Sequence, residues 1–183
     1  MDDDSAAHAF YSRVVERLVI ELAAATIGDT FNQYASAPHL RARLSDYLAA
    51  RRGAPILLVG EAAGYRGARV SGIPFTSERQ LTGAGPAETT ATIVHRVLAE
   101  LGIEEEVLLW NVVPTHPGTP SSNRTPTRDE AAEGVRFLEQ LAGGRRVIAA
   151  GRLAEQATRA TYVRHPSRGG ARRFCEGLLQ SLS

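Results

Sequence analysis

The chain has 183 residues, which is enough for one sizeable α/β domain and short for two. Its formal net charge is only +1, and its single cysteine, Cys175, excludes an intrachain disulfide and a four-cysteine metal cluster. No apolar run approaches the ~20 residues that cross a bilayer, and the acidic start differs from a basic secretory signal. We therefore expect one cytoplasmic domain over residues 1–183, without membrane association.

Two helices are expected in the N-terminal part of the chain, 1–50. Residues 10–25 have the apolar spacing of an amphipathic helix, and 38–50 have that of a second, covering helix. The α/β core is expected over 55–183. It opens with the short apolar run 56–59, which is typical of a buried parallel strand.

The rest of the core alternates between strands and helices. Further strands are expected at 107–110, 147–150 and 161–163, and helices at 88–101, 128–141, 153–158 and 170–182. Thr127 and Glu130 have the spacing of a capping box, whereas 114–127 reads as a long irregular loop, functional or disordered. Such alternation predicts the α/β class: a three-layer α/β/α sandwich with a four-stranded parallel sheet.

Arginine is unevenly distributed along the chain. The segment 145–173 contains eight arginines against the single acidic residue Glu155, a local net charge of +7 (8 − 1) without histidine. A surface of this kind attracts polyanions, which indicates a nucleic-acid footprint. A GC-rich genome that encodes every basic residue as arginine is the other interpretation, because the chain has no lysine. It explains the residue type but not the clustering.

Three polar residues follow predicted strands. Glu61, Asn111 and His165 come at or just after the ends of three of them. In an open parallel sheet the ligand crevice lies at the carboxyl ends of the strands, so we expect these side chains in one site. Taken singly, each has a structural explanation: a solvated loop carboxylate, a turn-capping amide and a histidine fixed beside a proline. Phe75, in a loop, could be ordinary core.

Nucleotide-binding patterns are weak in this chain. The segment 60–67 could form a phosphate-binding turn, but it lacks the GxGxxG spacing, and no Gly-Lys-Ser/Thr occurs. A nucleotide hydrolase is also disfavoured, because the loops show no clustered carboxylates to hold magnesium.

Six short segments form a pattern in chain order. They are Gly60-Glu61-Ala62-Ala63-Gly64, Gly72-Ile73-Pro74-Phe75-Thr76, Asn111-Val112-Val113, Asn123-Arg124-Thr125-Pro126-Thr127, Ala149-Ala150-Gly151 and His165-Pro166-Ser167. The pattern resembles the uracil-DNA glycosylase superfamily, most closely its iron-sulfur branch in bacteria and archaea, which has GEAPG, G-x-PF, NVV and NRxPT at the first four places. The likeness runs over about 56–182.

The resemblance implies a role for each candidate residue. Glu61 would orient the attacking water or offset the sugar cation, and His165 would hydrogen-bond the base oxygen on which negative charge grows. Phe75 would stack on the flipped base, and Asn111 would read its Watson–Crick edge. Further implied contacts are Gly60, Ala62 and Tyr65 to the base, and Ser167, Arg168 and Arg172 to the DNA backbone.

The sequence departs from that branch in three ways. The cysteine ligands are absent, so we expect no iron-sulfur cluster, no metal and no other cofactor. Gly64 stands where the best-known uracil enzymes carry a tyrosine that shuts out 5-substituted pyrimidines, and Tyr65 follows it, so exclusion of thymine or of a larger 5-substituent stays open. The segment 168–173 stands where many relatives place an apolar wedge, which fits a single-stranded substrate or an arginine that fills the gap.

These residues together predict a monomeric, monofunctional DNA glycosylase. It would hydrolyse the N-glycosidic bond of uracil or a related modified pyrimidine and leave an abasic site. Water would be the nucleophile, because the chain has no lysine to form a Schiff base. The alternative is a base-binding module of the same fold without catalysis. The sequence does not identify the base, the strandedness of the DNA, or whether the role is repair or attack on foreign modified DNA.

Overall fold

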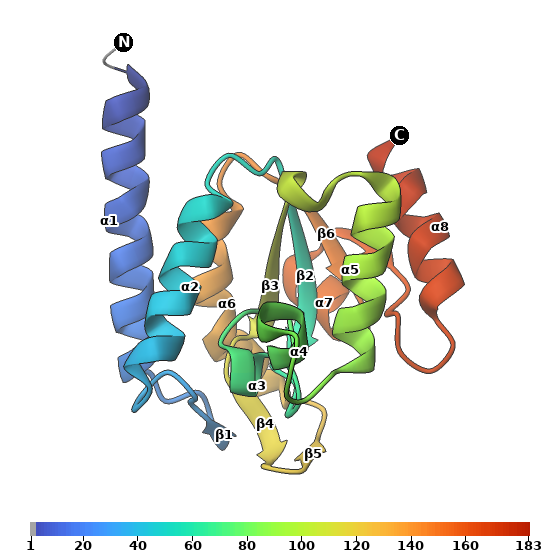
Figure 1. The fold of residues 1–183 in the computed structure, drawn as a ribbon, viewed down its shortest axis with the longest axis horizontal. Helices are drawn as coiled ribbons and strands as arrows, with labels where there is room; N and C mark the ends of the chain where they lie inside the picture. Colours follow the sequence, from blue (N-terminus) through green and yellow to red (C-terminus); the bar gives the residue numbers. More distant parts are fainter. Residues whose placement is uncertain (1–2) are drawn as a thin grey trace.

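The structure, a computed structural model, describes residues 3–183 (Figure 1). Its elements in chain order are α1 (Asp3–Ala24), β1 (Thr30–Phe31), α2 (Pro38–Ala50), β2 (Ile56–Ala62), α3 (Ala68–Ser71), α4 (Glu78–Thr82), α5 (Thr89–Leu101), the 3-10 helix η1 (Glu104–Glu106), β3 (Val107–Val113), β4 (His116–Thr119), β5 (Ser122–Asn123), α6 (Arg128–Ala142), β6 (Arg146–Ala150), α7 (Arg152–Thr158), β7 (Thr161–Val163) and α8 (Ala171–Leu182).

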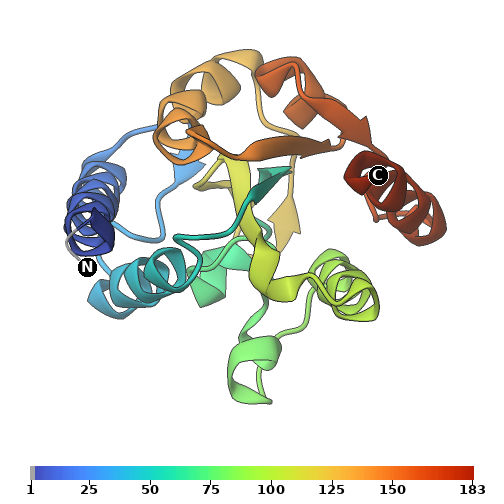
Figure 2. The same ribbon diagram turned by 90° about the horizontal axis from the view of Figure 1, so that it is seen from above.

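A four-stranded parallel sheet lies at the centre, in the order β3-β2-β6-β7. Its register pairs Ile56 of β2 with Val107 of β3 and with Arg146 of β6. All seven residues of β3 are buried, as expected for a parallel strand covered on both faces. Helices cover both faces of this sheet (Figure 2), so the predicted α/β class and three-layer sandwich are confirmed.

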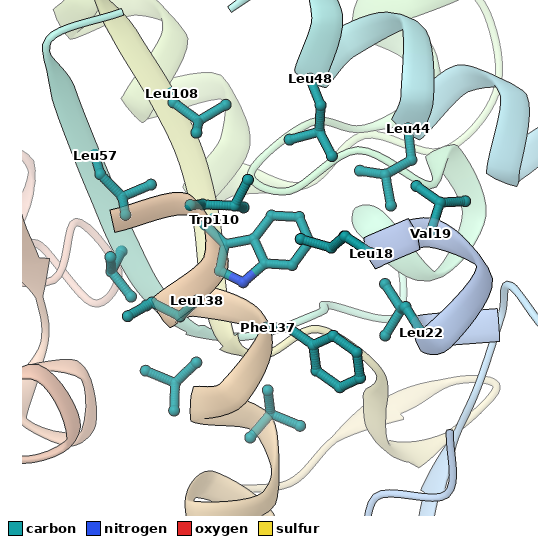
Figure 3. Close-up of a cluster of buried hydrophobic side chains, with 14 of the residues drawn as sticks. Leu18, Val19, Leu22, Leu44, Leu48, Leu57, Leu108, Trp110, Phe137 and Leu138 are labelled. Carbon is teal, nitrogen blue, oxygen red and sulfur yellow. The ribbon is translucent and has the colours of Figure 1, made fainter. Parts of the chain in front are cut away.

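Alternate side chains of β2 face two separate cores. Leu57 and Val59 pack in the cluster with α1, α2, α6 and α7, whereas Leu58 packs in the cluster with α5 and α8. In the first cluster the fully buried indole of Trp110 lies among side chains of α1, α2 and α6 (Figure 3). Successive residues of the strand face opposite sides, and both sides are buried, so the strand is apolar at every position. For this reason short continuous apolar runs predicted the strands.

The capping box at the start of α6 is confirmed. The Thr127 hydroxyl accepts a hydrogen bond from the Glu130 amide at 3.1 Å, and the Glu130 carboxylate accepts one from the Thr127 amide at 2.8 Å. The two residues satisfy backbone donors that the first helical turn would leave unpaired. They also fix the end of the segment 114–127 onto the sandwich.

That segment is more ordered than the irregular loop we expected. It contains β4 and β5, which join β1 in a small antiparallel sheet near the carboxyl ends of β2 and β3 (Figure 1). The buried imidazole of His116 bonds the carbonyl oxygens of Ala63 and Thr119, each at 2.8 Å. The pairing was missed because β1 is a two-residue strand some 85 positions earlier in the chain, without a local pattern.

Several boundaries also differ from those predicted. β2 continues to Ala62 and β3 to Val113, because Gly60 pairs with Asn111 beyond the apolar runs. α1 begins before residue 10, and α3, α4 and η1 were not predicted. Polar residues that continue a strand past its apolar part are therefore part of the sheet edge rather than of flexible loops.

Candidate active site

A cavity of about 140 Å³ lies where β2 and β3 end. Glu61, Phe75, Asn111 and His165 all line it, so the expected convergence of these four residues is confirmed. The rest of its wall is formed by Ala62, Ala63, Gly64, Glu88, Thr90, Pro117, Asn123, Arg124 and Pro126. The cavity thus brings together residues that are far apart in the sequence, from Glu61 to His165.

Gly60 makes room for the aromatic ring and the amide. A Cβ atom at this position would lie 2.2 Å from Cζ of Phe75 and 2.8 Å from Oδ1 of Asn111. The sheet register explains this proximity, because Gly60 and Asn111 are paired across β2 and β3, and a Cβ atom on Gly60 would point to the same face of the sheet as the Asn111 side chain. Gly60 itself does not line the cavity, so its contribution is the space it leaves.

Phe75 is held in a strained backbone conformation. Its φ of 52° lies in the left-handed region, which costs a residue with a large side chain energy, and its side chain is buried. Ser71 holds the turn around it, because its hydroxyl hydrogen-bonds the carbonyl of Thr76 at 2.6 Å and accepts from the amide of Ile73 at 3.1 Å. This turn places the Phe75 ring where it lines the cavity and also packs in the core cluster with α5 and α8.

Glu61 sits on the opposite face of β2, against the start of α7. A Cβ atom on Gly151, which has a φ of 107°, would lie 2.7 Å from the Glu61 carboxylate. Burial raises the pKa of Glu61, and a hydrogen bond from the backbone of Leu153 acts in the opposite direction. The residue also lines a wider groove of about 810 Å³ along α6 and α7, so its carboxylate stands between the cavity and that groove.

His165 is arranged as a neutral hydrogen-bond donor. Its Nδ1 accepts from the backbone amide of Ser167 at 3.2 Å and lies 2.8 Å from the Ser167 hydroxyl. Burial lowers the pKa of His165, and the neighbouring Arg164 lowers it further. Since an amide N–H can only donate, Nδ1 carries no proton, and in the neutral ring the proton is on Nε2.

Asn123 and Arg124 bring the segment before α6 to the cavity wall. The side-chain oxygen of Asn123 accepts a hydrogen bond from the Tyr65 amide at 2.8 Å. Arg124 forms a bidentate ion pair with Glu130, at 2.5 and 2.7 Å. This pair lowers the pKa of Glu130 to about 2, mainly through the hydrogen bonds from Arg124. The sequence pattern marked this segment, but no role was predicted for either residue.

The remaining candidates lie in different places. Ala62 lines the cavity, whereas Tyr65 does not. The Arg66 guanidinium lies over the Tyr65 ring, 5.3 Å from the ring centroid. Ser167 holds His165, and Arg168 is exposed on the same loop with a φ of 52°. Arg172 is exposed, but it forms an ion pair with Glu176 at 2.7 Å. Of the residues predicted to contact the base, Gly60 and Tyr65 are therefore the two that do not line the cavity.

Some arginines of the segment 145–173 bind other groups of the protein. Arg145 donates to the carbonyls of Leu141 and Arg52, and Arg152 pairs with Glu155 at 2.6 Å. With Arg172 engaged as well, the excess charge available to a polyanion is smaller than the sequence count. Arg164, Arg168 and Arg173 are exposed, and all three lie on the loop that carries His165 or on the start of α8.

Glu88 was not predicted as a site residue. It precedes the first residue of α5, and its side chain lines the cavity. Burial raises the pKa of this carboxyl group. Within residues 3–183, no group of three or more histidine, cysteine, aspartate or glutamate side chains is arranged to hold a metal ion. No helix in the same range is long and apolar enough to cross a membrane.

Comparisons with known proteins agree with this geometry. A family model described as the uracil DNA glycosylase superfamily matches residues 48–177. The crystal structure of wild-type Pedobacter heparinus SMUG2 is similar to this chain, with a TM-score of 0.66 and 10% identity over 92% of this chain and 96% of that one. No curated protein sequence matched. The structural likeness supports the fold, and the family match, which includes every predicted site residue, supports DNA glycosylase activity in general. The chain belongs to the uracil DNA glycosylase superfamily.

Proposed function

We propose that this protein is a monofunctional DNA glycosylase that removes uracil or a related modified pyrimidine from DNA and leaves an abasic site. One observation carries the proposal: a carboxylate, an amide, an imidazole and an aromatic ring line a cavity of about 140 Å³. Cavities of ~150 Å³ accept one six-membered ring. An extruded pyrimidine is therefore the size of ligand that this cavity accommodates.

Phe75 and Asn111 would bind the extruded base. The strained backbone and the packing against Gly60 fix the Phe75 ring, and a fixed ring can stack on a base without losing side-chain freedom. Asn111 is 3% exposed, and its side-chain oxygen lies close to Gly60. An amide both donates and accepts, so it matches the adjacent N3–H and O4 of uracil.

Glu61 and His165 would act where charge develops. Breaking the N-glycosidic bond leaves an electron-poor sugar and an anionic base. A carboxylate at Glu61 stabilises the sugar and orients water, which has access from the groove along α6 and α7. The Nε2–H of neutral His165 donates to the base oxygen that becomes negative, and its tautomer is set by Ser167.

The test is base release from defined oligonucleotides. Each carries one uracil, hypoxanthine, thymine mispair or 5-substituted cytosine, and alkali then cleaves any abasic site. We expect cleavage at uracil or a modified pyrimidine, with large losses in Glu61→Gln and His165→Ala. In Asn111→Asp, uracil excision should fall because a carboxylate offers no amide donor to O4. Retarded but intact DNA would instead identify a base-binding module without catalysis.

A further inference from the structure

A histidine on α5 contacts the turn that carries Phe75. Nε2 of His95 lies 3.1 Å from the Thr76 hydroxyl. Burial lowers the pKa of His95, and a hydrogen bond with the backbone of Phe75 acts in the opposite direction. A bond that raises the pKa of an imidazole is one that the ring donates, so the Phe75 carbonyl is its acceptor. One side chain of α5 thus binds both the residue that would stack on the base and the residue that follows it.

Phe75 depends on such contacts, because its φ of 52° is strained for a residue with a large side chain. Conformations of this kind persist where the surrounding structure fixes them from several sides. The hydrogen bonds of Ser71 lie within the turn and set its shape. Tyr34 anchors the beginning of the turn, through a 2.9 Å hydrogen bond from its hydroxyl to the Gly72 carbonyl. His95 anchors the other end, at Phe75 itself.

The helix that carries His95 is a fixed reference for the cavity. α5 begins at the cavity wall, where Thr90 lines it, and its buried Val94 packs in the same core cluster as Phe75. Nδ1 of His95 lies 3.9 Å from the Glu104 carboxylate, so the imidazole lies between the turn and η1. A reacting group displaced by ~1 Å from its productive geometry can lower a rate by ~100-fold. The position of the turn on α5 therefore matters for base stacking.

We propose that His95 is a positioning residue, which holds the Phe75 ring in place for the extruded base. The inference rests on the proposed function and adds to it a residue outside the cavity, since His95 does not line the cavity wall. Without the imidazole, the Phe75 carbonyl loses a donor, and the turn can relax toward an unstrained backbone. The ring would then leave its place beside Gly60, and its stack on the base would be lost.

The first test is a double-mutant cycle on the rate of base release in a single turnover. His95→Leu should lower the rate at least about fivefold, the effect of one lost hydrogen bond, and His95→Gln, which keeps a donor, should lower it less. In a Phe75→Ala background, His95→Leu should cause no further loss, because the ring that it positions is absent. Losses that multiply in the double variant would overturn the proposal and assign His95 to the stability of the fold alone.

The second test observes the ring itself and needs no catalysis. Nuclear Overhauser effects between the Phe75 ring protons and the α protons of Gly60 report their contact, which is close in the structure. We expect these effects in wild type and in His95→Gln, and their loss in His95→Leu. Their persistence in His95→Leu would overturn the inference. A protein that releases no base, but loses the contact in His95→Leu, would overturn the proposed catalysis and support the positioning role.

His39→Leu is the matched control, because His39 is an exposed histidine on α2 outside the cavity. It should keep the wild-type rate and the contact. Thr76→Val removes the hydroxyl that His95 contacts, and it should lower the rate and weaken the contact in the same direction. If circular dichroism shows that His95→Leu does not fold, Thr76→Val replaces it in both tests, and wild-type values in that variant would overturn the inference.

Discussion

Gly60 and Phe75 are in such close contact that a single added carbon at residue 60 would overlap the ring, at 2.2 Å from its Cζ atom. We therefore expect Gly60→Ala to move the ring and the Asn111 amide together. Phe75→Ala should weaken base excision by roughly 1–3 kcal/mol, the range for loss of a base–aromatic stack, or about 5- to 150-fold. Single-turnover rates on the best substrate measure both effects.

Gly60→Ala should lower the rate at least as much as Phe75→Ala, because it disturbs two base contacts rather than one. Gly53→Ala is the control, since a Cβ atom at residue 53 would meet nothing within 4 Å. Wild-type rates in Gly60→Ala would mean that the ring and the amide relax without cost, and that their present positions are not needed for excision.

The pH dependence of excision should show a loss of activity on the acid side. Glu61 acts as a carboxylate, and burial raises its pKa above the ordinary 4.5, so it becomes protonated earlier as the pH falls. His165 acts as a neutral donor, and burial together with Arg164 lowers its pKa below the ordinary 6.5, so it stays neutral longer. Both groups lose their active form in the same direction, and neither causes a loss at alkaline pH.

Single-turnover rates measured between about pH 4.5 and 8.5, with folding monitored by circular dichroism, check this expectation. Glu61→Gln should lower the rate and remove the contribution of this carboxyl to the acid limb. Activity that falls as the pH rises through the lowered pKa of His165 would show that His165 works as an imidazolium, contrary to the tautomer set by Ser167.

The Arg124–Glu130 pair should stabilise the fold in a pH-dependent manner. The native pKa of Glu130 is about 2 against an ordinary 4.5, so its stabilising effect is complete above about pH 4.5 and is lost as the pH falls towards 2. We expect Glu130→Gln to lower the free energy of unfolding at neutral pH by about 1–3 kcal/mol. The lower end is favoured, because Arg124 is 36% exposed and screened by solvent.

Urea denaturation of wild type and Glu130→Gln at several pH values measures this difference. The gap between the two curves should close between about pH 4.5 and 2. Glu133→Gln is a useful comparison, because Glu133 also accepts a hydrogen bond from the Gly28–Asp29 turn, at 2.8 Å from the Gly28 amide, but is exposed. A constant gap at every pH would point to lost packing rather than to the charge of Glu130.

DNA affinity should depend on the exposed arginines near His165. Phosphate contacts release counterions, so replacing Arg164, Arg168 and Arg173 by alanine should weaken binding to any DNA sequence and reduce its salt dependence. The control replaces Arg145, Arg152 and Arg172, which already contact other groups of the protein. Equal loss in the two triple variants, both folded, would assign the effect to net charge rather than to a footprint beside the cavity.

The parts of the site that the sequence predicted are those fixed by the sheet. Glu61 and Asn111 could be placed because their strands are parallel and neighbouring, so their carboxyl ends meet at one edge. Glu88 could not be placed, since its position depends on the absence of side chains at Gly64 and Gly67 in a separate turn. Tyr65 was predicted beside the base, but the backbone of this turn bonds Asn123 and its side chain lines no part of the cavity.

The ion pair of Arg172 was not predicted, although the sequence contains the reason for it. Glu176 is four residues further along α8, and this spacing brings the two side chains together on one helix face. The pairing of β1, β4 and β5, unlike the Arg172–Glu176 ion pair, could not be predicted from a local spacing. Two-residue strands have no period, and their pairing is accompanied by hydrogen bonds between the hydroxyls of Thr30 and Thr115 and between the imidazole of His116 and the Ala63 carbonyl. Such contacts are not local and leave no trace in the sequence pattern.

Strand cleavage should not accompany base release, because the chain lacks the amine that this reaction uses. Glycosylases that also cut the strand form a Schiff base between an amine, usually of lysine, and the opened sugar. This chain has no lysine. The primary amine that remains is the α-amino group of Met1, which lies outside the described residues. The described start of α1 lies at the far end of the molecule from β4 and β5 (Figure 1).

We therefore expect the abasic strand to remain intact until alkali or heat is applied. Borohydride added during turnover reduces a Schiff base to a stable amine, so it should trap no covalent protein–DNA adduct. A bifunctional glycosylase with a catalytic lysine, treated in parallel, shows that trapping works under the same conditions. A trapped adduct with this protein would implicate the N-terminal amine, and blocking that amine by acetylation should then abolish the adduct. With no adduct, water is the nucleophile, and Glu61 is the carboxylate that borders both the cavity and the groove.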